Sequence, residues 1–248
     1  MIPDTNKLTK IAETRLKFQR NYEPKLRSLV ETRTKQLGFA NGERKAALKS
    51  IDALAWKLTA AGIHMERLWE YRKSATLERL LESANQYNFE PKRFTDAEVA
   101  YLTIEFEAYL VQARAFINVA QIHTLDACRI QFGGQLTNEK YEKAVQHAPL
   151  EVSDRLVSAY NFFENEVFGD GKWGFLLKSL RDRVVHFDRI RPSVSENVGT
   201  EQLTVTGLTL ERLAQDFENG HYDLFLNVIA PIWGRKWIAG ANTPGMWE

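Results

Sequence analysis

The chain has 248 residues, of which 44% are hydrophobic and 26% are charged, a balance that supports a large hydrophobic core and excludes an intrinsically disordered protein. Its 33 Lys and Arg residues almost cancel its 32 Asp and Glu residues, so the formal net charge of +1 neither favours nor excludes a nucleic-acid partner. Any nucleic-acid-binding surface must therefore be local. Cys128 is the only cysteine, which excludes an internal disulfide.

The sequence does not indicate export or membrane anchoring. Residues 1–10 are polar and lack the apolar segment of a signal peptide. The most apolar late stretch, residues 224–233, is too short to span a bilayer. We therefore expect a cytoplasmic protein.

The N-terminal part of the chain has the apolar spacing of helices. Three helical stretches are predicted, over residues 7–37, 43–64 and 65–87. Pro24 is expected to break or kink the first of them. Residues 88–95 contain Pro91 and precede a helix-capping pattern, so they predict a boundary that separates an N-terminal helical extension, residues 1–94, from the rest.

The remainder predicts an all-α helical bundle over residues 95–232. One long central helix is expected over residues 96–132, ended by Gly133 and Gly134. Further helices are predicted over residues 137–148, 151–168, 173–187 and 210–229. A β-branched run at residues 203–206 predicts one short strand or a small β-hairpin, and residues 233–248 are expected to form an irregular aromatic tail.

One short motif lies near the end of the helix predicted over residues 173–187. It contains Arg181, Asp182 and His186. A guanidinium can bind phosphate oxygens through two parallel hydrogen bonds, and an imidazole exchanges protons near neutral pH. This trio of side chains is therefore suited to metal-free phosphodiester chemistry.

The motif and the helix order resemble the HEPN family over residues 95–233. Members of that family often carry Arg, then Asn, Asp or His, then three residues, then His, as Arg181, Asp182 and His186 do here. The resemblance implies an all-α dimeric endoribonuclease that needs no cofactor, often a toxin or an anti-phage defence protein restrained by an inhibitory antitoxin. Some members have a modified tyrosine two residues after the histidine. Asp188 stands there, which argues against that regulation.

The spacing of the motif poses a geometric problem. On one helix, Arg181 and His186 diverge by about 140° around the axis. Either the helix loosens at its end, or two copies of the chain share one site, as the resemblance favours. Asp182 lies four residues before His186, so its carboxylate is expected to orient the imidazole and favour its protonated form.

Other interpretations of the same residues stay open. The motif can also be an exposed salt-bridge cluster with a histidine at a helix end. Three more arginines add to the local positive charge: Arg183, Arg189 and Arg191. They are either RNA-binding residues or solvated surface residues. The main alternative function is a non-catalytic helical module that binds RNA or a protein, and a third is a scaffold that makes contacts through its aromatic tail.

Other polar residues give weaker signals. The remaining histidines are scattered and predict no metal site: His64, His123, His147 and His221. We expect His123 to be a hydrogen-bonded helix residue and Cys128 to serve packing. One side of the central helix carries polar residues that could line a channel or face solvent: Arg114, Asn118, Gln121 and Arg129.

Overall fold

The fold was taken from a computed structural model, which describes residues 23–84, 96–132, 136–185, 193–194, 203–205, 208–234, 237–240 and 243–247. The predicted all-α class is confirmed. The helices are α2 (Glu23–Gln36), α3 (Asn41–Ala84), α4 (Asp96–Ala127), α5 (Asn138–Gln146), α6 (Leu150–Phe162), α7 (Trp173–Val185) and α8 (Leu210–Leu224). Two π-helical turns, η1 (Phe163–Val167) and η2 (Phe225–Ile229), extend α6 and α8, and a 3₁₀ turn, η3 (Pro231–Trp233), follows.

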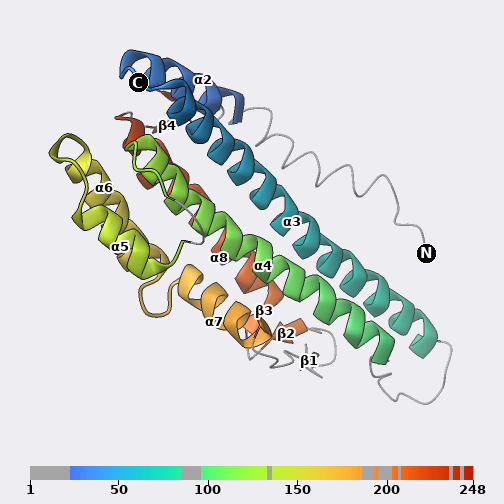
Figure 1. The fold of residues 1–248 in the computed structure, drawn as a ribbon. Coiled ribbons are helices and arrows are strands. Elements are labelled where there is room, and N and C mark those ends of the chain that lie inside the picture. The colour runs from blue at the N-terminus through green and yellow to red at the C-terminus, as the bar shows by residue number, and fades with distance from the viewer. Residues whose placement is uncertain are drawn as a thin grey trace.

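Two long antiparallel helices, α3 and α4, pack against each other along the bundle (Figure 1). The prediction of a single long helix was incomplete, because α3 has 44 residues and α4 has 32. The expected division of α3 between His64 and Met65 is absent. Gly62 lies inside the helix, and the burial of Ala61, Met65 and Leu68 against the core offsets the modest helix-breaking tendency of a glycine.

The C-terminal end of α4 comes earlier than predicted. Arg129 has a left-handed φ of 60°, the N–H of Ile130 donates to the carbonyl of Leu125 at 2.9 Å, and the N–H of Arg129 donates to that of Asp126 at 3.1 Å. This is the hydrogen-bond pattern of a Schellman motif, usually built on glycine. The Arg129 side chain stacks on the ring of Phe39 at 4.4 Å and donates to the carbonyl of Leu37. Contacts with the α2–α3 connection therefore accompany this helix end.

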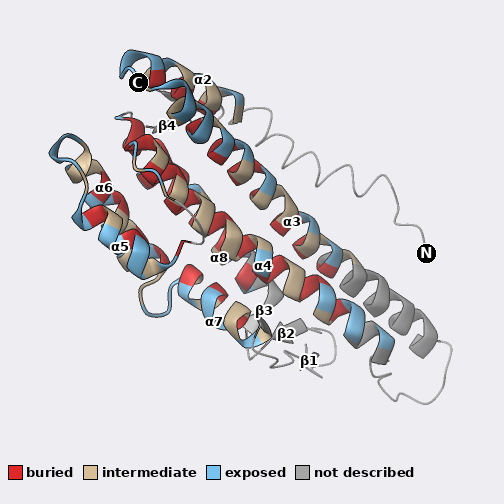
Figure 2. Cartoon of the chain, viewed as in Figure 1, coloured by how far each residue is buried: buried red, intermediate tan, exposed pale blue. Residues whose placement is uncertain are grey.

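Helices α5, α6 and α7 lie on the side of α4 away from α3 (Figure 1), whereas α2 packs against α3. In Figure 2 buried residues run along much of α4, whereas exposed and buried positions alternate on α5, α6 and α7. A single buried cluster extends from Leu26 through α3 and α4 to Trp233. The described part of residues 1–94 therefore shares its core with the rest of the bundle.

Short strands complete the fold near the C-terminus. They are β1 (Ser193–Val194), β2 (Leu203–Val205), β3 (Leu208–Thr209), β4 (Trp237–Gly240) and β5 (Thr243–Trp247). The first three form one antiparallel sheet, which agrees with the predicted hairpin. The last two pair where an irregular tail was expected. Trp233 is fully buried and is not a contact surface. No helix in the described ranges has the length and apolar character to cross a membrane.

Candidate functional site

Close contacts at two glycines accompany the packing of the motif helix, α7, against the bundle. A Cβ atom added at Gly174 would lie 2.4 Å from a methyl carbon of Val167 in η1. One added at Gly220 of α8 would lie 2.2 Å from the ring of Trp173, the first residue of α7. Both distances are far below van der Waals contact, so α7 packs closely against η1 and α8 because these positions lack side chains.

The motif arginine lies beside the buried face of α7. Leu177 and Leu180 are buried, whereas the side chains of Arg181 and Asp182 are 36% and 41% exposed. Nη1 of Arg181 donates to Oδ1 of Asp182 at 3.0 Å. The first carboxylate of the motif therefore binds the motif arginine, and both groups remain partly accessible to a ligand.

The structure describes only one of the remaining predicted site residues. Arg183 is exposed on the last turn of α7. His186, Arg189 and Arg191 lie outside the described residues, as does the predicted contact between Asp182 and the imidazole of His186. The structure thus places Arg181 and Asp182 together and leaves the other predicted contacts as predictions.

A further arginine, Arg114, lies on α4, the helix against which α7 packs. Its guanidinium stacks over the ring of Phe168, 4.6 Å from the centroid, and its Nη2 lies at the hydrogen-bond limit of 3.5 Å from Oδ1 of Asn138. Its Nη1 is buried and has no hydrogen-bond partner among the residues that the structure describes. Figure 1 shows α7 running along α4, against which it packs, and Asn138 is the first residue of α5.

Burial and the charges of α7 both act on the guanidinium of Arg114. Burial lowers the pKa of Arg114 to about 10, the carboxylate of Asp182 opposes that change, and the charge of Arg181 adds to it. Arg114 is therefore still a cation at neutral pH, and it is close enough to α7 for both charges to act on it. The hydrogen bond of Asp182 goes to Arg181, and the charge of Asp182 also acts on Arg114.

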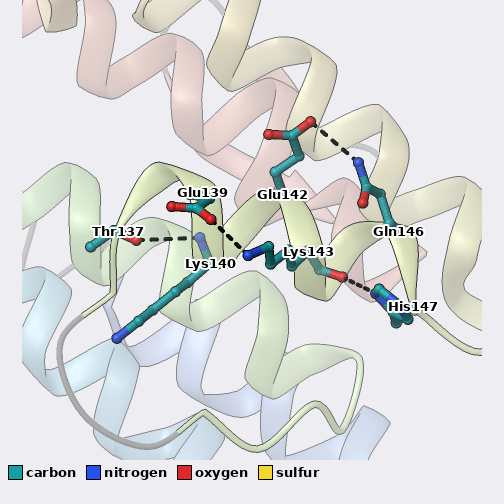
Figure 3. Close-up of polar contacts among 7 residues, drawn as sticks. All are labelled: Thr137, Glu139, Lys140, Glu142, Lys143, Gln146 and His147. Carbon is teal, nitrogen blue, oxygen red and sulfur yellow. Dashed lines mark hydrogen bonds and ion pairs between the residues drawn. The ribbon is translucent and has the colours of Figure 1, made fainter.

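The start of α5 is held in place by its own side chains, drawn in Figure 3. The hydroxyl of Thr137 accepts a hydrogen bond from the N–H of Lys140 and so caps the N-terminus of α5. Lys143 pairs with Glu139 at 2.6 Å along the outer face. This cap fixes Asn138 as the first residue of α5, beside Arg114.

Sequence patterns had grouped Arg114 with three other residues of the central helix. Arg129 does not share its surroundings, since it contacts the α2–α3 connection instead. Gln121 is buried, and its Nε2 has no hydrogen-bond partner within the described ranges. The polar periodicity indicates a shared helix face, but nothing local in the sequence predicts that the charges of Arg181 and Asp182 act on Arg114.

His123 belongs to a buried structural network. The indole Nε1 of Trp233 donates to Nε2 of His123 at 3.0 Å, and Nδ1 of His123 lies 2.8 Å from the hydroxyl of Ser50. Because an indole N–H only donates, Nε2 must accept, and the imidazole proton sits on Nδ1 and points to Ser50. His123 therefore cannot take a proton from Ser50 as a general base. Burial lowers its pKa to about 4, which matches a neutral packing role.

The other groups considered as ligands or nucleophiles have structural partners. Nδ1 of His64 lies 2.7 Å from Oε2 of Glu105 across the α3–α4 contact. The other oxygen of Glu105, Oε1, pairs with Nη1 of Arg67 at 3.3 Å. Cys128 is buried just beyond the end of α4, and burial raises the pKa of its thiol to about 11. Within the described ranges, no three His, Cys, Asp or Glu side chains are grouped to hold a metal ion.

Comparison with known proteins does not assign a family. No protein-family model matches the chain, and no curated protein or solved structure matches it significantly. The resemblance to HEPN proteins thus rests on the Arg181, Asp182 and His186 motif and on the order of the helices.

Proposed function

We propose that this chain is a metal-independent endoribonuclease of the HEPN type. The observation that carries the proposal is the state of Arg181, which is partly exposed on α7 and bound by the neighbouring Asp182 in a motif that ends with His186. A guanidinium held in this way can bind a phosphate through its remaining N–H groups. His186 supplies a side chain that exchanges protons at neutral pH.

The proposed reaction is an internal transfer at phosphorus. The 2′-oxygen of RNA bonds to phosphorus as its proton leaves, and the bond from phosphorus to the 5′-oxygen breaks as that oxygen gains a proton. His186 removes the first proton or supplies the second, and Arg181 stabilises the charge on the phosphorane-like transition state. The products are a 2′,3′-cyclic phosphate and a 5′-hydroxyl end.

The biological setting is proposed from the same resemblance. The chain would act in the cytoplasm as a homodimer, with the two motifs facing one RNA strand. Cleavage of cellular or invading RNA would stop growth, in the manner of a toxin or an anti-phage defence protein, and a protein antitoxin would restrain it. Arg183, Arg189 and Arg191 would bind phosphates on either side of the scissile bond.

The test is cleavage of end-labelled single-stranded RNA by the full chain in the presence of a chelator. We expect His186→Ala and Arg181→Gln each to reduce cleavage by at least about 100-fold, since each removes a group that acts in the transition state. His147→Ala and Arg212→Gln are matched controls, because they replace an exposed histidine and an exposed, ion-paired arginine on other helices.

Mixing the two inactive variants tests the shared site. Partial recovery of cleavage is expected if the arginine of one copy works with the histidine of the other. Cleavage that survives in His186→Ala would disprove the catalytic assignment. RNA binding without cleavage in the unaltered protein would favour the non-catalytic module instead.

A further inference from the structure

One outward face of α3 carries exposed apolar side chains. Trp56 is 64% exposed and Ile63 is 39% exposed. They lie two turns apart on the same side of the helix, with Thr59 between them and Asp52 one turn before Trp56. We call these four residues the α3 strip. A tryptophan exposed to this extent, with a second apolar residue on the same face, offers a surface on which another segment can bury apolar area.

Helix α2 already covers the start of the α3 strip. It packs against the first turns of α3 (Figure 1), and the guanidinium of Arg27 donates to the carboxylate of Asp52. The short connection from Gln36 to Asn41 makes the two helices antiparallel. Glu23, the first residue of α2, is one turn before Arg27 and therefore reaches the level of Trp56. The chain that precedes Glu23 thus enters α2 beside the exposed part of the strip.

The sequence before α2 repeats the apolar pattern of α2 itself. Three residues form the buried apolar face of α2: Leu26, Leu29 and Val30. Three more apolar residues stand about five full helical turns earlier, at Leu8, Ile11 and Ala12. Phe18 and Tyr22 fall on the same side of such a helix, and the opposite side is charged, with Lys10, Glu13, Lys17 and Arg20. Residues 7–22 therefore predict an amphipathic helix whose apolar side continues the buried face of α2.

The predicted helix matches the α3 strip in length and register. As a helix, residues 7–22 span about 24 Å, which exceeds the rise of about 10 Å from Trp56 to Ile63. The antiparallel register that Arg27 and Asp52 set brings Phe18 to a level between Trp56 and Ile63. Pro24 lies in the first turn of α2, where a bend lets the preceding segment adjust its angle to α3.

The far end of the predicted contact is also complementary in charge. In the same register, Lys7 falls near the level of Glu70, which is one turn beyond Glu66 on the same side of α3. A basic start of the segment would thus meet acidic side chains of α3. Apolar residues would meet in the middle of the contact and opposite charges at its end.

We propose that residues 7–22 form a helix that packs antiparallel on the α3 strip, with Phe18 against Trp56 and Ile63. The segment continues the path of α2 along α3, so the strip is an interaction surface for the chain's own N-terminal region. This contact is independent of the proposed endoribonuclease activity.

Disulfide formation across the proposed contact in the full chain tests the docking. Cys128→Ala first removes the single natural thiol. Ala12→Cys and Glu66→Cys should then form an intrachain disulfide, because the register brings these positions to the same level on facing sides. Glu13→Cys with Glu66→Cys is the matched control, since residue 13 is on the opposite side of the same predicted helix. We expect the first pair to oxidise at least about 5-fold faster, because disulfide geometry is specific.

A second measurement keeps Cys128 and therefore applies even if Cys128→Ala fails to fold. Phe18→Ala should lower the unfolding temperature of the full chain by about 4 °C, because it removes the apolar group that covers Trp56 and Ile63. Lys17→Ala changes the neighbouring residue on the charged side and should leave the unfolding temperature unchanged.

Three results would overturn the inference. Equal rates of disulfide formation in the two cysteine pairs would show that residues 7–22 approach α3 without a fixed face. Equal unfolding temperatures of Phe18→Ala and Lys17→Ala would show that Phe18 buries no apolar surface. Disulfides between chains, in place of those within one chain, would show that a second copy covers the α3 strip.

Discussion

Asp182 accepts a hydrogen bond from Arg181, its neighbour on α7, and its charge also acts on Arg114 of α4. The contact with His186 that helical spacing predicts lies outside the described residues. An ion pair between partly exposed neighbours contributes little to stability, so this contact matters more for holding the Arg181 guanidinium in place. That distinction separates the effect of Asp182 on binding from its effect on catalysis.

We predict that Asp182→Asn lowers the rate of RNA cleavage on the order of 10-fold while RNA affinity stays equal or rises. The rate falls because Arg181 loses the anchor that orients it. The affinity does not fall, because removing a carboxylate increases the positive charge that faces the phosphates. Single-turnover cleavage and RNA binding in the His186→Ala background measure the two effects. Weaker binding by Asp182→Asn would contradict this role.

The placement of α7 depends on packing against η1 and α8 rather than on its own sequence. Gly174 and Gly220 lie where the neighbouring Val167 and Trp173 leave no room for a side chain. Trp173 also makes an edge contact with Phe217 of α8, with ring centroids 5.8 Å apart. A change in this packing would shift the whole helix and the motif it carries.

Gly220→Ala should therefore destabilise the protein by about 1–3 kcal/mol, since the new methyl group overlaps the Trp173 ring. The control is Gly42→Ala in the first turn of α3, where nothing lies within 4 Å of the added carbon. That change should be neutral or stabilising by up to about 1 kcal/mol, because alanine favours helix. Denaturant unfolding measures both, and equal effects would refute the packing argument.

A buried hydrogen-bond network around His123 links three elements of the bundle. Ser50 comes from α3, His123 from α4 and Trp233 from the end of η3, so three distant parts of the chain meet at one imidazole. Burial raises the pKa of the nearby Asp126 to about 6, and the Ser50 hydroxyl opposes this change. The stability of the whole molecule should consequently depend on pH.

The sign of the His123 contribution to the pH dependence of stability follows from its pKa. This pKa is about 4 in the folded protein, below the value of about 6.5 in the unfolded chain. Between these values the unfolded state binds the extra proton, so the free energy of unfolding falls as pH falls. Asp126 acts in the opposite direction, because its carboxyl is protonated more readily in the folded state. A comparison that leaves Asp126 unchanged isolates the imidazole.

We predict that His123→Gln is less stable than the unaltered protein at pH 7.5 and that the difference narrows by about 2 kcal/mol at pH 5. The glutamine amide does not titrate, so only the unaltered protein loses the His123 contribution on acidification. Urea unfolding of both proteins at the two pH values gives the difference. Parallel pH profiles would show that His123 is not held neutral in the folded state.

Much of the helical order could be read from short-range patterns. The start of α5 just after Thr137 and the start of α7 at Trp173 follow from signals within one or two turns. The all-α class follows from apolar residues repeating at the helical period. These features depend on hydrogen bonds and burial along a single segment, which the local sequence carries.

Contacts between distant segments could not be read in that way. Arg129 adopts a left-handed conformation while its side chain contacts Leu37 and Phe39, and α4 ends there instead of at the glycines beyond it. The packing of α4 against α7 brings Arg114 close enough for the charges of Arg181 and Asp182 to act on it, although no sequence pattern links these residues. Packing between helices far apart in the chain sets these positions, since it depends on the shapes of both surfaces at once.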